Sequence, residues 1–418
     1  MADMTDVKTE DKIAIDGFTE EGENLSSINE GSEQLGMKKH SHGDAPVVPE
    51  ASRGERRTSF KLEDFAPLTG REEDWRFTPL KRLRGLHTDE LTGSGPSINV
   101  TAGSSVTVET VGADDSRRGR AFVPDDRVAA AAWEAVREVT VITIPDETSL
   151  DAEVTVAITG TDRAASAQHI IIDSGKFSRA VVVLDHQGTT TLAQNVEVIV
   201  GESSHLTVVS IQEWDDDAVH ASAQQARVGR DAHYKHVAVN LGGDLVRLTP
   251  SSRFDAPGGN VEMYGLYFAD AGQHFEQRLL VDHAVPKCKS RVTYKGALQG
   301  RGAHTVWVGD VLIRKEAEGT DSYETNRNLV LTDGARADSV PNLEIETGLI
   351  EGAGHASATG RFDDEQLFYF MARGIPEDVA RRLVVRGFLN EIIQQIGVPA
   401  IEERLSEAVE RELSAGNL

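Results

Sequence analysis

Short β-branched segments fill the middle of this chain, from residue 139 to about residue 350, and constrain its fold more than any other feature. Typical segments are 139–144 (VTVITI), 154–158 (VTVAI) and 196–200 (VEVIV). Gly, Asp and Asn residues separate the segments, and almost no helical pattern interrupts them. Branched side chains favour strands, so this long series predicts a sandwich, a barrel or a solenoid.

A parallel β-helix fits this series best. Each strand of such a fold has a core face and neighbouring strands above and below, so near-continuous apolar runs are tolerated. The sequence has no strict short repeat such as a hexapeptide, and its turns are irregularly spaced. We therefore expect a mainly β protein whose parallel β-helix core covers residues 139–355.

The segments before this core have a different composition. Residues 1–58 are rich in Glu, Asp, Ser, Gly and Lys, and they are expected to be disordered because they cannot bury enough apolar surface to offset the entropy of ordering. Arg56 and the neighbouring arginines are interpreted as part of a solvated linker. Residues 59–138 are expected to form a mixed, partly helical N-terminal region in which Trp75 anchors a core and residues 128–136 form a short helix.

The pattern becomes helical near the C-terminus, where residues 356–418 are expected to form a helical domain. A broad apolar stripe at helical spacing predicts one buried helix face, made of Val379, Leu383, Phe388, Ile392 and Ile396 and backed by Val384, Leu389 and Ile393. Gly397 and Pro399 are typical of a helix end, and an amphipathic helix is expected over residues 401–413.

The junction between these regions carries one histidine. Residues 343–349 alternate apolar and polar side chains as a half-buried strand does, and a run of small residues, 352–360, follows. His355 lies in this run, past the expected strand end, where functional groups are often displayed. A neutral imidazole at this position could ligate a metal, but a single histidine needs further ligands from another chain.

Charge and cysteine content exclude several classes of function. The chain carries 43 Lys and Arg against 68 Asp and Glu, a net charge of -25, which disfavours binding to nucleic acid or to anionic lipid. Its single cysteine, Cys288, cannot form a disulfide or a thiolate cage within one chain. No apolar run approaches the about 20 residues of a membrane span, and the first residues lack a signal-peptide pattern. We therefore expect a cytoplasmic protein.

Other chemistry-bearing residues do not form an assembled catalytic set. His233 and His236 are expected to point to opposite faces of one strand, and His274 and His283 would meet only through the fold. Cys288 has cationic neighbours that would lower its pKa if the thiol were exposed. The chain lacks a P-loop, a dinucleotide fingerprint, a G-x-S-x-G elbow and an H-E-x-x-H motif, so we expect no enzyme activity.

Several spaced motifs resemble the SufB/SufD family of iron-sulfur cluster assembly proteins, on the SufD side of that family. The resemblance covers roughly residues 60 to 410. The matching motifs, in family order, are E-D-W-R-F-T-P-L (73–80), K-S-R-V-T-Y-K-G (289–296), T-D-S-Y-E-T-N-R-N-L-V-L-T-D (320–333), P-N-L-E-I (341–345), G-H-A-S-A-T-G-R (354–361) and D-E-Q-L-F-Y-F-M-A-R-G-I (364–375).

This resemblance implies a right-handed parallel β-helix between a helical N-terminal region and a C-terminal helical domain. It also implies a non-ATPase subunit of the SUF scaffold complex, which pairs with SufB and binds the ABC-type ATPase SufC through its C-terminal helices. The residues expected to dock SufC are Leu383, Phe388 and Ile392. The family supplies no ATP site in this chain, and a homodimer is possible when the chain is alone.

The family's interface histidine corresponds to His355, which would contact a nascent iron-sulfur cluster shared with SufB. Ala353 stands where the family often has a cysteine. This difference favours the SufD side over the SufB side, and a cluster held by this chain alone is not expected. Two alternatives remain open: a cytoplasmic homodimeric β-helix protein without a cluster role, and a β-helix enzyme that acts on polysaccharides.

Overall fold

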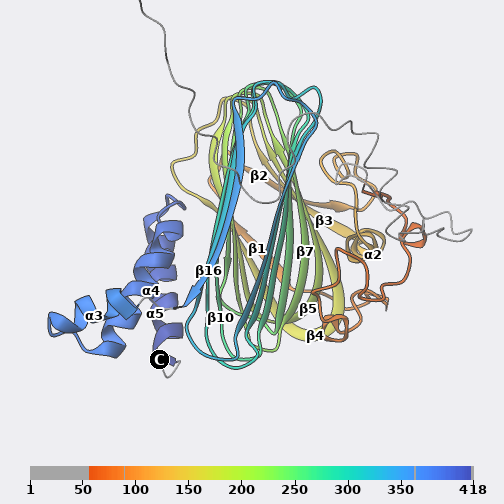
Figure 1. The fold of residues 1–418 in the computed structure, drawn as a ribbon. Coiled ribbons are helices and arrows are strands. Elements are labelled where there is room, and N and C mark those ends of the chain that lie inside the picture. The colour runs from red at the N-terminus through yellow and green to blue at the C-terminus, as the bar shows by residue number, and fades with distance from the viewer. Residues whose placement is uncertain (1–55, 89, 362–363, 416–418) are drawn as a thin grey trace, which may run out of the picture. The chain divides into compact units, whose positions relative to one another are not determined.

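Parallel strands coil into a solenoid whose successive strands alternate between two stacks (Figure 1). The second half of the long strand β5, with β7, β9, β11, β13 and β15, forms one stack, called here the odd stack. The first half of β5, with β6, β8, β10, β12, β14 and β16, forms the even stack. The computed structural model describes residues 56–88, 90–361 and 364–415, which belong to one compact unit. Apart from residues 56–58, the expected disordered tail lies outside these residues. The prediction of a mainly β, parallel β-helix fold is confirmed.

The elements follow one another along the chain as a short mixed region, a long series of strands and three final helices. The first region contains η2 (Leu62–Asp64), η3 (Leu80–Leu83), β1 (Ser97–Thr101), β2 (Thr107–Gly112) and α2 (Arg127–Ala135). The strands are β3 (Glu138–Ile144), β4 (Val154–Ser174), β5 (Arg179–Val200), β6 (His205–Trp214), β7 (Val219–Val228), β8 (His233–Asn240), β9 (Leu245–Phe254), β10 (Asn260–Ala269), β11 (His274–His283), β12 (Lys289–Leu298), β13 (His304–Ile313), β14 (Asp321–Val330), β15 (Arg336–Ile345) and β16 (Gly352–Arg361). The last helices are α3 (Asp364–Ala372), α4 (Glu377–Ile393) and α5 (Pro399–Ala415).

One coil of the solenoid takes between 26 and 32 residues. The shortest step pairs Val219 with Leu245, and the longest pairs Lys289 with Asp321. Strands β9 to β16 each have 10 residues, so the turns take up the difference in length. This is why the sequence shows many strands but no strict repeat.

Alternate residues of each strand face the interior of the coil or its outside, as period-2 geometry requires. In β10, Val261, Met263 and Tyr267 belong to the interior core. Leu266 and Phe268 of the same strand point outward and pack under the C-terminal helices. Both faces of the strand are therefore buried, which explains the nearly continuous apolar runs of the sequence.

The N-terminal region covers the outer face of the odd stack. Trp75 is 3% exposed and packs in a cluster with Val128 of α2 and with Val219 and Leu245 of the odd stack. Helix α2 begins at Asp126, whose side chain accepts a hydrogen bond from the backbone N–H of Ala129. The predictions of an aromatic anchor and of a short helix here are confirmed.

Buried ion pairs fasten this cover to the odd stack. Arg247 of β9 stacks on the ring of Trp75 at 3.8 Å and pairs with Asp126 at 3.1 Å. Arg278 of β11 pairs with Asp74 at 2.7 Å. Arg56 reaches Asp310 of β13 at 3.0 Å, so its interpretation as part of a solvated linker is wrong. The sequence gives no sign of this contact because 254 residues separate the two partners.

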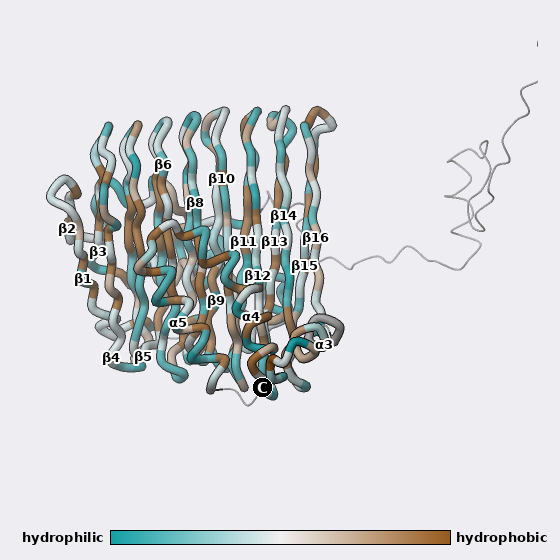
Figure 2. Tube along the Cα trace, turned by 90° about the vertical axis from the view of Figure 1, so that its left-hand side faces the viewer, coloured by the Kyte–Doolittle hydropathy of each residue, from teal (hydrophilic) through white to brown (hydrophobic). Residues whose placement is uncertain are grey.

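Helices α4 and α5 cover the outer face of the even stack, as both views show (Figures 1 and 2). The buried helix face is made of Val385, Leu389, Ile392, Ile393, Ile396, Ile401, Leu405, Val409 and Leu413. Leu389, Ile392, Ile393 and Ile396 of the expected stripe belong to this face, whereas Leu383 is 43% exposed and Phe388 is only partly buried. None of the helices among the described residues has the length and apolar character needed to cross a membrane.

The junction after the solenoid differs from the sequence expectation. β15 ends at Ile345, and Leu349 is 64% exposed, so the strand does not continue to residue 349. The run of small residues is itself a strand, β16, which pairs in parallel with β14 along its whole length. The solenoid therefore extends to Arg361 rather than 355, because ladder pairing overrides the low strand propensity of Gly, Ala and Ser.

Candidate functional site

His355 lies on β16, the last strand of the even stack, and not past a strand end as expected. Its ladder partner is Glu324 of β14. The imidazole Nδ1 is 3.8 Å from the Glu324 carboxylate oxygen Oε1, and the His355 side chain is 42% exposed whereas that of Glu324 is fully buried. The site is thus one accessible imidazole over one buried carboxylate.

The last coil leaves His355 accessible. Among the described residues no strand pairs with the outer edge of β16, which ends the even stack. The small neighbour of His355, Gly354, points to the opposite face of the strand, where it lies beside the ring of Tyr323. A Cβ atom on Gly354 would lie 3.1 Å from that ring. The imidazole is therefore uncrowded because the coil ends, and not because its neighbours are small.

Glu324 is buried without a hydrogen-bond partner for either carboxylate oxygen among the described residues. Burial, and secondly the negative charge of Asp310, raise the pKa of the Glu324 carboxyl to about 8. Gly309 of β13 makes room for the group, since a Cβ atom there would lie 2.5 Å from Oε2 of Glu324. A buried polar group without a partner costs free energy, so its presence calls for an explanation.

A polar network joins the last coils on the same inward face as His355, four residues further along β14 and β16. The Asn328 amide Nδ2 of β14 donates to Ser339 of β15 at 3.0 Å and to Thr359 of β16 at 3.3 Å. The Tyr267 hydroxyl donates to Oδ1 of Asn328 at 2.6 Å. These contacts tie β15 and β16 to the preceding coils, so the strand that carries His355 is held in register.

The other histidines of interest do not converge. His236 faces the interior and hydrogen bonds to Gln224 at 2.8 Å, whereas His233 is partly exposed and pairs with Glu262 at 2.6 Å. Burial lowers the pKa of His236 to about 4. His283 is buried against Ser290, and burial lowers its pKa to about 3. The expectation that His233 and His236 point to opposite faces is confirmed.

His274 lies on the odd stack, where its Nδ1 is 3.2 Å from Nδ1 of His304. It is therefore separated from His283, which belongs to the same strand but faces the interior. Cys288 is fully buried in the interior core, where burial raises the pKa of its thiol. The expected lowering by cationic neighbours required an exposed thiol, and the structure does not provide one.

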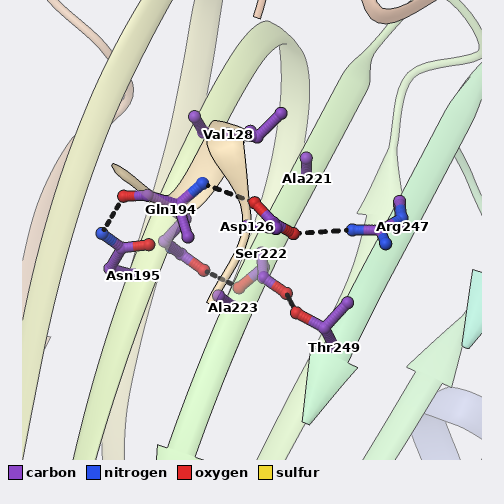
Figure 3. A pocket seen from close by; sticks show the side chains of 11 residues that line it. Asp126, Val128, Gln194, Asn195, Ala221, Ser222, Ala223, Arg247 and Thr249 are labelled. Atoms are coloured by element: carbon purple, nitrogen blue, oxygen red, sulfur yellow. Dashed lines mark hydrogen bonds and ion pairs between the residues drawn. The ribbon is translucent and has the colours of Figure 1, made fainter. Parts of the chain in front are cut away.

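A small pocket between α2 and the odd stack is lined by both polar and small apolar residues (Figure 3). Asp126 bridges to Arg247 there, and the Asn195 amide donates to the carbonyl oxygen of Ala129 at 3.0 Å. The free volume is about 10 Å³, which is about the space of one water molecule. These contacts therefore dock the helix, and the pocket has no room for a larger ligand.

No group of three or more His, Cys, Asp or Glu side chains able to hold a metal ion occurs within residues 56–88, 90–361 and 364–415. His355 with Glu324 is thus at most half of a coordination sphere. Any metal or cluster at this end of the solenoid needs further donors from outside these residues.

Comparison with known proteins identifies the family. Residues 156–388 match the family model described as "SUF system FeS cluster assembly, SufBD core domain". The chain is also 54% identical over 371 residues to an iron-sulfur cluster assembly SufBD family protein of Mycobacterium leprae, covering 87% of this chain and 95% of the relative. A relative with the same description in Mycobacterium tuberculosis is 55% identical over 370 residues, covering 87% and 93%.

The chain belongs to the SufBD family. A second SufBD family protein of Mycobacterium leprae is only 27% identical over 237 residues, which cover 53% of this chain and 27% of that protein. The one bacterium therefore holds two members of the family, and this chain is similar to one of them far more than to the other.

The SufBD core model includes both Glu324 and His355. Sequence reasoning selected His355 and missed Glu324, although the residue stands in one of the quoted motifs. The polar residues Ser322, Glu324, Asn326 and Asn328 alternate along β14 and all face inward. Such alternation normally indicates a solvent-facing side, so the sequence alone could not place this carboxylate inside the coil.

Four large apolar side chains on the neighbouring helices α3 and α4 are exposed in this SufBD chain, and they are called here the α3–α4 surface. Its members are Phe368, Tyr369, Met371 and Leu383, with exposed fractions of 72%, 53%, 44% and 43%. Ile392, one of the expected docking residues, is 1% exposed and packs against the solenoid. Phe388 lies against Lys295, whose ammonium is 4.7 Å from its ring centre. Of the three expected docking residues, only Leu383 belongs to this α3–α4 surface.

Proposed function

We propose that this chain is the SufD-type, non-ATPase subunit of a SUF scaffold complex in the cytoplasm. In this proposal it pairs with a SufB-like chain through the open end of the solenoid and presents His355 to a nascent iron-sulfur cluster shared by the two chains. The observation that carries the proposal is the accessible imidazole on a terminal strand, near which the described residues form no group of three metal donors.

The geometry of the solenoid end supports pairing with another chain. Strands β15 and β16 terminate the two stacks, and an unpaired strand edge presents backbone N–H and C=O groups that a further strand can bind. The presence of two SufBD family proteins in one bacterium supports a second family member as the partner. Ala353 packs in the interior core, so this chain would leave the thiolate donors to that partner.

The α3–α4 surface supports a second contact, with a SufC-like ATPase. Exposed aromatic and aliphatic side chains that cluster on one surface commonly mark protein interfaces. We assign the docking to Phe368, Tyr369, Met371 and Leu383, and we leave Ile392 out because it stabilises the helices on the solenoid. The chain itself would bind no nucleotide and catalyse no reaction.

Tagged chain purified from its own cells tests the assembly. We expect it to retain a second SufBD family protein and an ATPase in one complex on size exclusion chromatography. A chain that elutes as a homodimer with neither partner would reject the proposal and favour the interaction protein without a cluster role.

The variant His355→Ala tests the site within that complex. Because His355 is exposed on a terminal strand, its removal should leave the complex intact but lower the iron and sulfide content after anaerobic reconstitution. His205→Ala removes another exposed histidine of the even stack and serves as the matched control. Unchanged cluster content in His355→Ala would remove the imidazole from the mechanism.

A further inference from the structure

We infer that Glu324 and His355 form a two-donor metal half-site, in which the buried carboxylate and the imidazole bind one divalent first-row metal ion together. The inference deepens the proposed function and rests on it for the identity of the ion as iron of the assembling cluster. The pairing of the two side chains can be tested on this chain alone.

The positions of the two donors support a shared ion. His355 and Glu324 are direct ladder partners on adjacent parallel strands, so both side chains project inward from one level of the coil. Their facing atoms, Nδ1 and Oε1, are 3.8 Å apart, which is longer than a hydrogen bond. Imidazole nitrogen and carboxylate oxygen bind such metals at about 2.0 to 2.2 Å, so one ion can bridge a gap of this size.

The surroundings of Glu324 leave the carboxylate without another role. Neither oxygen has a hydrogen-bond partner among the described residues, and the nearby charged group that acts on it from β13 is the negative Asp310. Gly309 provides the space that the carboxylate occupies. Two other buried carboxylates are paired with arginines: Glu276 of β11 with Arg247, and Asp310 with Arg56. Glu324 therefore stands out as an acceptor aimed at the accessible imidazole.

The donor types indicate which metal the pair would take. A carboxylate oxygen with an imidazole nitrogen suits Fe(II), as in sites built from histidine and carboxylate ligands, whereas thiolates suit iron already bridged by sulfide. The pair would thus hold an incoming ferrous ion on this chain, and the remaining positions would be filled by water or by donors of the partner. His355 would act as a ligand at the surface and Glu324 as a ligand from below.

Anaerobic titration of the full-length chain with Co(II) tests this inference. Co(II) takes the same nitrogen and oxygen donors as Fe(II) and is followed by its visible absorption. We expect Glu324→Gln and His355→Ala each to weaken binding at least tenfold relative to the wild type. Glutamine keeps the size of the side chain and removes the carboxylate that would bind the metal, so the fold should persist. Glu262→Gln is the control, because this carboxylate already bonds to His233 at 2.6 Å.

Nuclear magnetic resonance of the histidine rings is a second test of metal binding at His355, because Co(II) bound to distant surface carboxylates would not broaden the His355 signals. Bound Co(II) should broaden the His355 imidazole signals in the wild type and leave them sharp in Glu324→Gln. Equal Co(II) affinity of the wild type and Glu324→Gln would overturn the inference. The inference would also be overturned if the variant that carries both Glu324→Gln and His355→Ala bound Co(II) as tightly as the wild type.

Partner capture separates this inference from the proposed function. Glu324→Gln should retain the second SufBD family protein as the wild type does, because the residue is buried below the interface strand. A chain that binds Co(II) through the pair but captures no partner would reject the scaffold proposal alone. A chain that captures the partner but shows no effect of Glu324 on Co(II) would reject the half-site alone.

Discussion

The two covers of the solenoid are attached by different forces. The N-terminal region is held to the odd stack by ion pairs of Arg56, Arg247 and Arg278, with arginine side chains that are largely buried. Helices α4 and α5 lie on the even stack mainly through aliphatic side chains. Their ion pairs are fewer: the buried Lys295 of β12 pairs with Glu391 of α4 at 2.6 Å, and Arg404 of α5, 35% exposed, pairs with Asp185. Buried charges require defined geometry, whereas apolar contacts are non-directional.

This difference in attachment gives the two covers different freedom to move on the solenoid. A cover fixed by buried pairs has one docked position, because a shifted position would leave charges buried without partners. A cover held by apolar contacts can shift at lower cost, and it carries the α3–α4 surface proposed to bind an ATPase. The N-terminal cover would therefore serve as a fixed support and the C-terminal helices as the adjustable part.

The largest effect should come from Arg247→Ala. Removing this guanidinium leaves Glu276 and Asp126 short of a partner, and breaking a buried pair costs about 3 to 5 kcal/mol. Chemical denaturation should show a loss of that size. Arg227→Ala removes the exposed pair with Asp255 and should cost less than about 1 kcal/mol. Equal losses in the two variants would contradict the claim that buried charges fix the N-terminal cover.

Ile392→Asp should release the C-terminal cover without unfolding the solenoid. The substitution places a carboxylate in an apolar interface, which costs several kcal/mol unless the helices detach. Limited proteolysis should then cut within α4 and α5 while the solenoid keeps its thermal midpoint. Loss of both together would show that this cover is as fixed as the other.

Leu383→Asp should weaken ATPase binding and leave the fold unchanged, because the side chain is 43% exposed. A tenfold or larger loss in affinity is expected if the residue lies in the centre of the interface. Phe177→Asp, at an exposed turn residue, is the matched control. Circular dichroism checks the fold, and an unchanged affinity would remove Leu383 from the docking surface.

Acid should weaken the attachment of the N-terminal cover. Burial alone would raise the pKa of Glu276, but Arg247, His274 and Arg278 lower it from 4.5 to about 2. A lowered pKa gives stability that is complete above pH 4.5 and is lost as the pH falls toward 2. The stability difference between the wild type and Glu276→Gln should therefore shrink across this range. A difference independent of pH would show that Glu276 is not charged in the fold.

The smallest effect should come from Arg404→Ala. Arg404 contacts Asp185 at 2.7 Å and Glu213 at 3.3 Å, but its side chain is 35% exposed. Pairs of this kind contribute about 0.5 to 1 kcal/mol. Urea denaturation should register no more than this loss, and a larger loss would mean that charge also fixes the C-terminal cover.

The sequence predicted the solenoid because its strands are buried on both faces and therefore rich in branched residues. It also predicted helices over residues 128–136 and 401–413, which the structure places at Arg127–Ala135 and Pro399–Ala415. It failed at β16, whose small residues have little strand propensity and become a strand only through pairing with β14. The pattern of residues within one segment of the sequence cannot show that this segment pairs with a strand one coil earlier in the chain.

The charged contacts were equally hidden from the sequence. Arg56 and Asp310 are distant in the chain and meet only because the N-terminal region folds back on β13. Glu324 looked like an ordinary polar residue of an alternating strand. His355 was selected because a lone imidazole among small residues is conspicuous, but the reason for its exposure is the end of the coil.

The ladder also makes the site sensitive to insertion in an unequal way. A residue added to the turn between Ile345 and Gly352 changes only the length of a loop, and turns of this solenoid already vary in length. A residue added between Gly352 and His355 reverses the side of the sheet on which the imidazole emerges. A point substitution would change the properties of the site in small steps, whereas one inserted residue within β16 would turn the His355 side chain from the inward to the outward face at once.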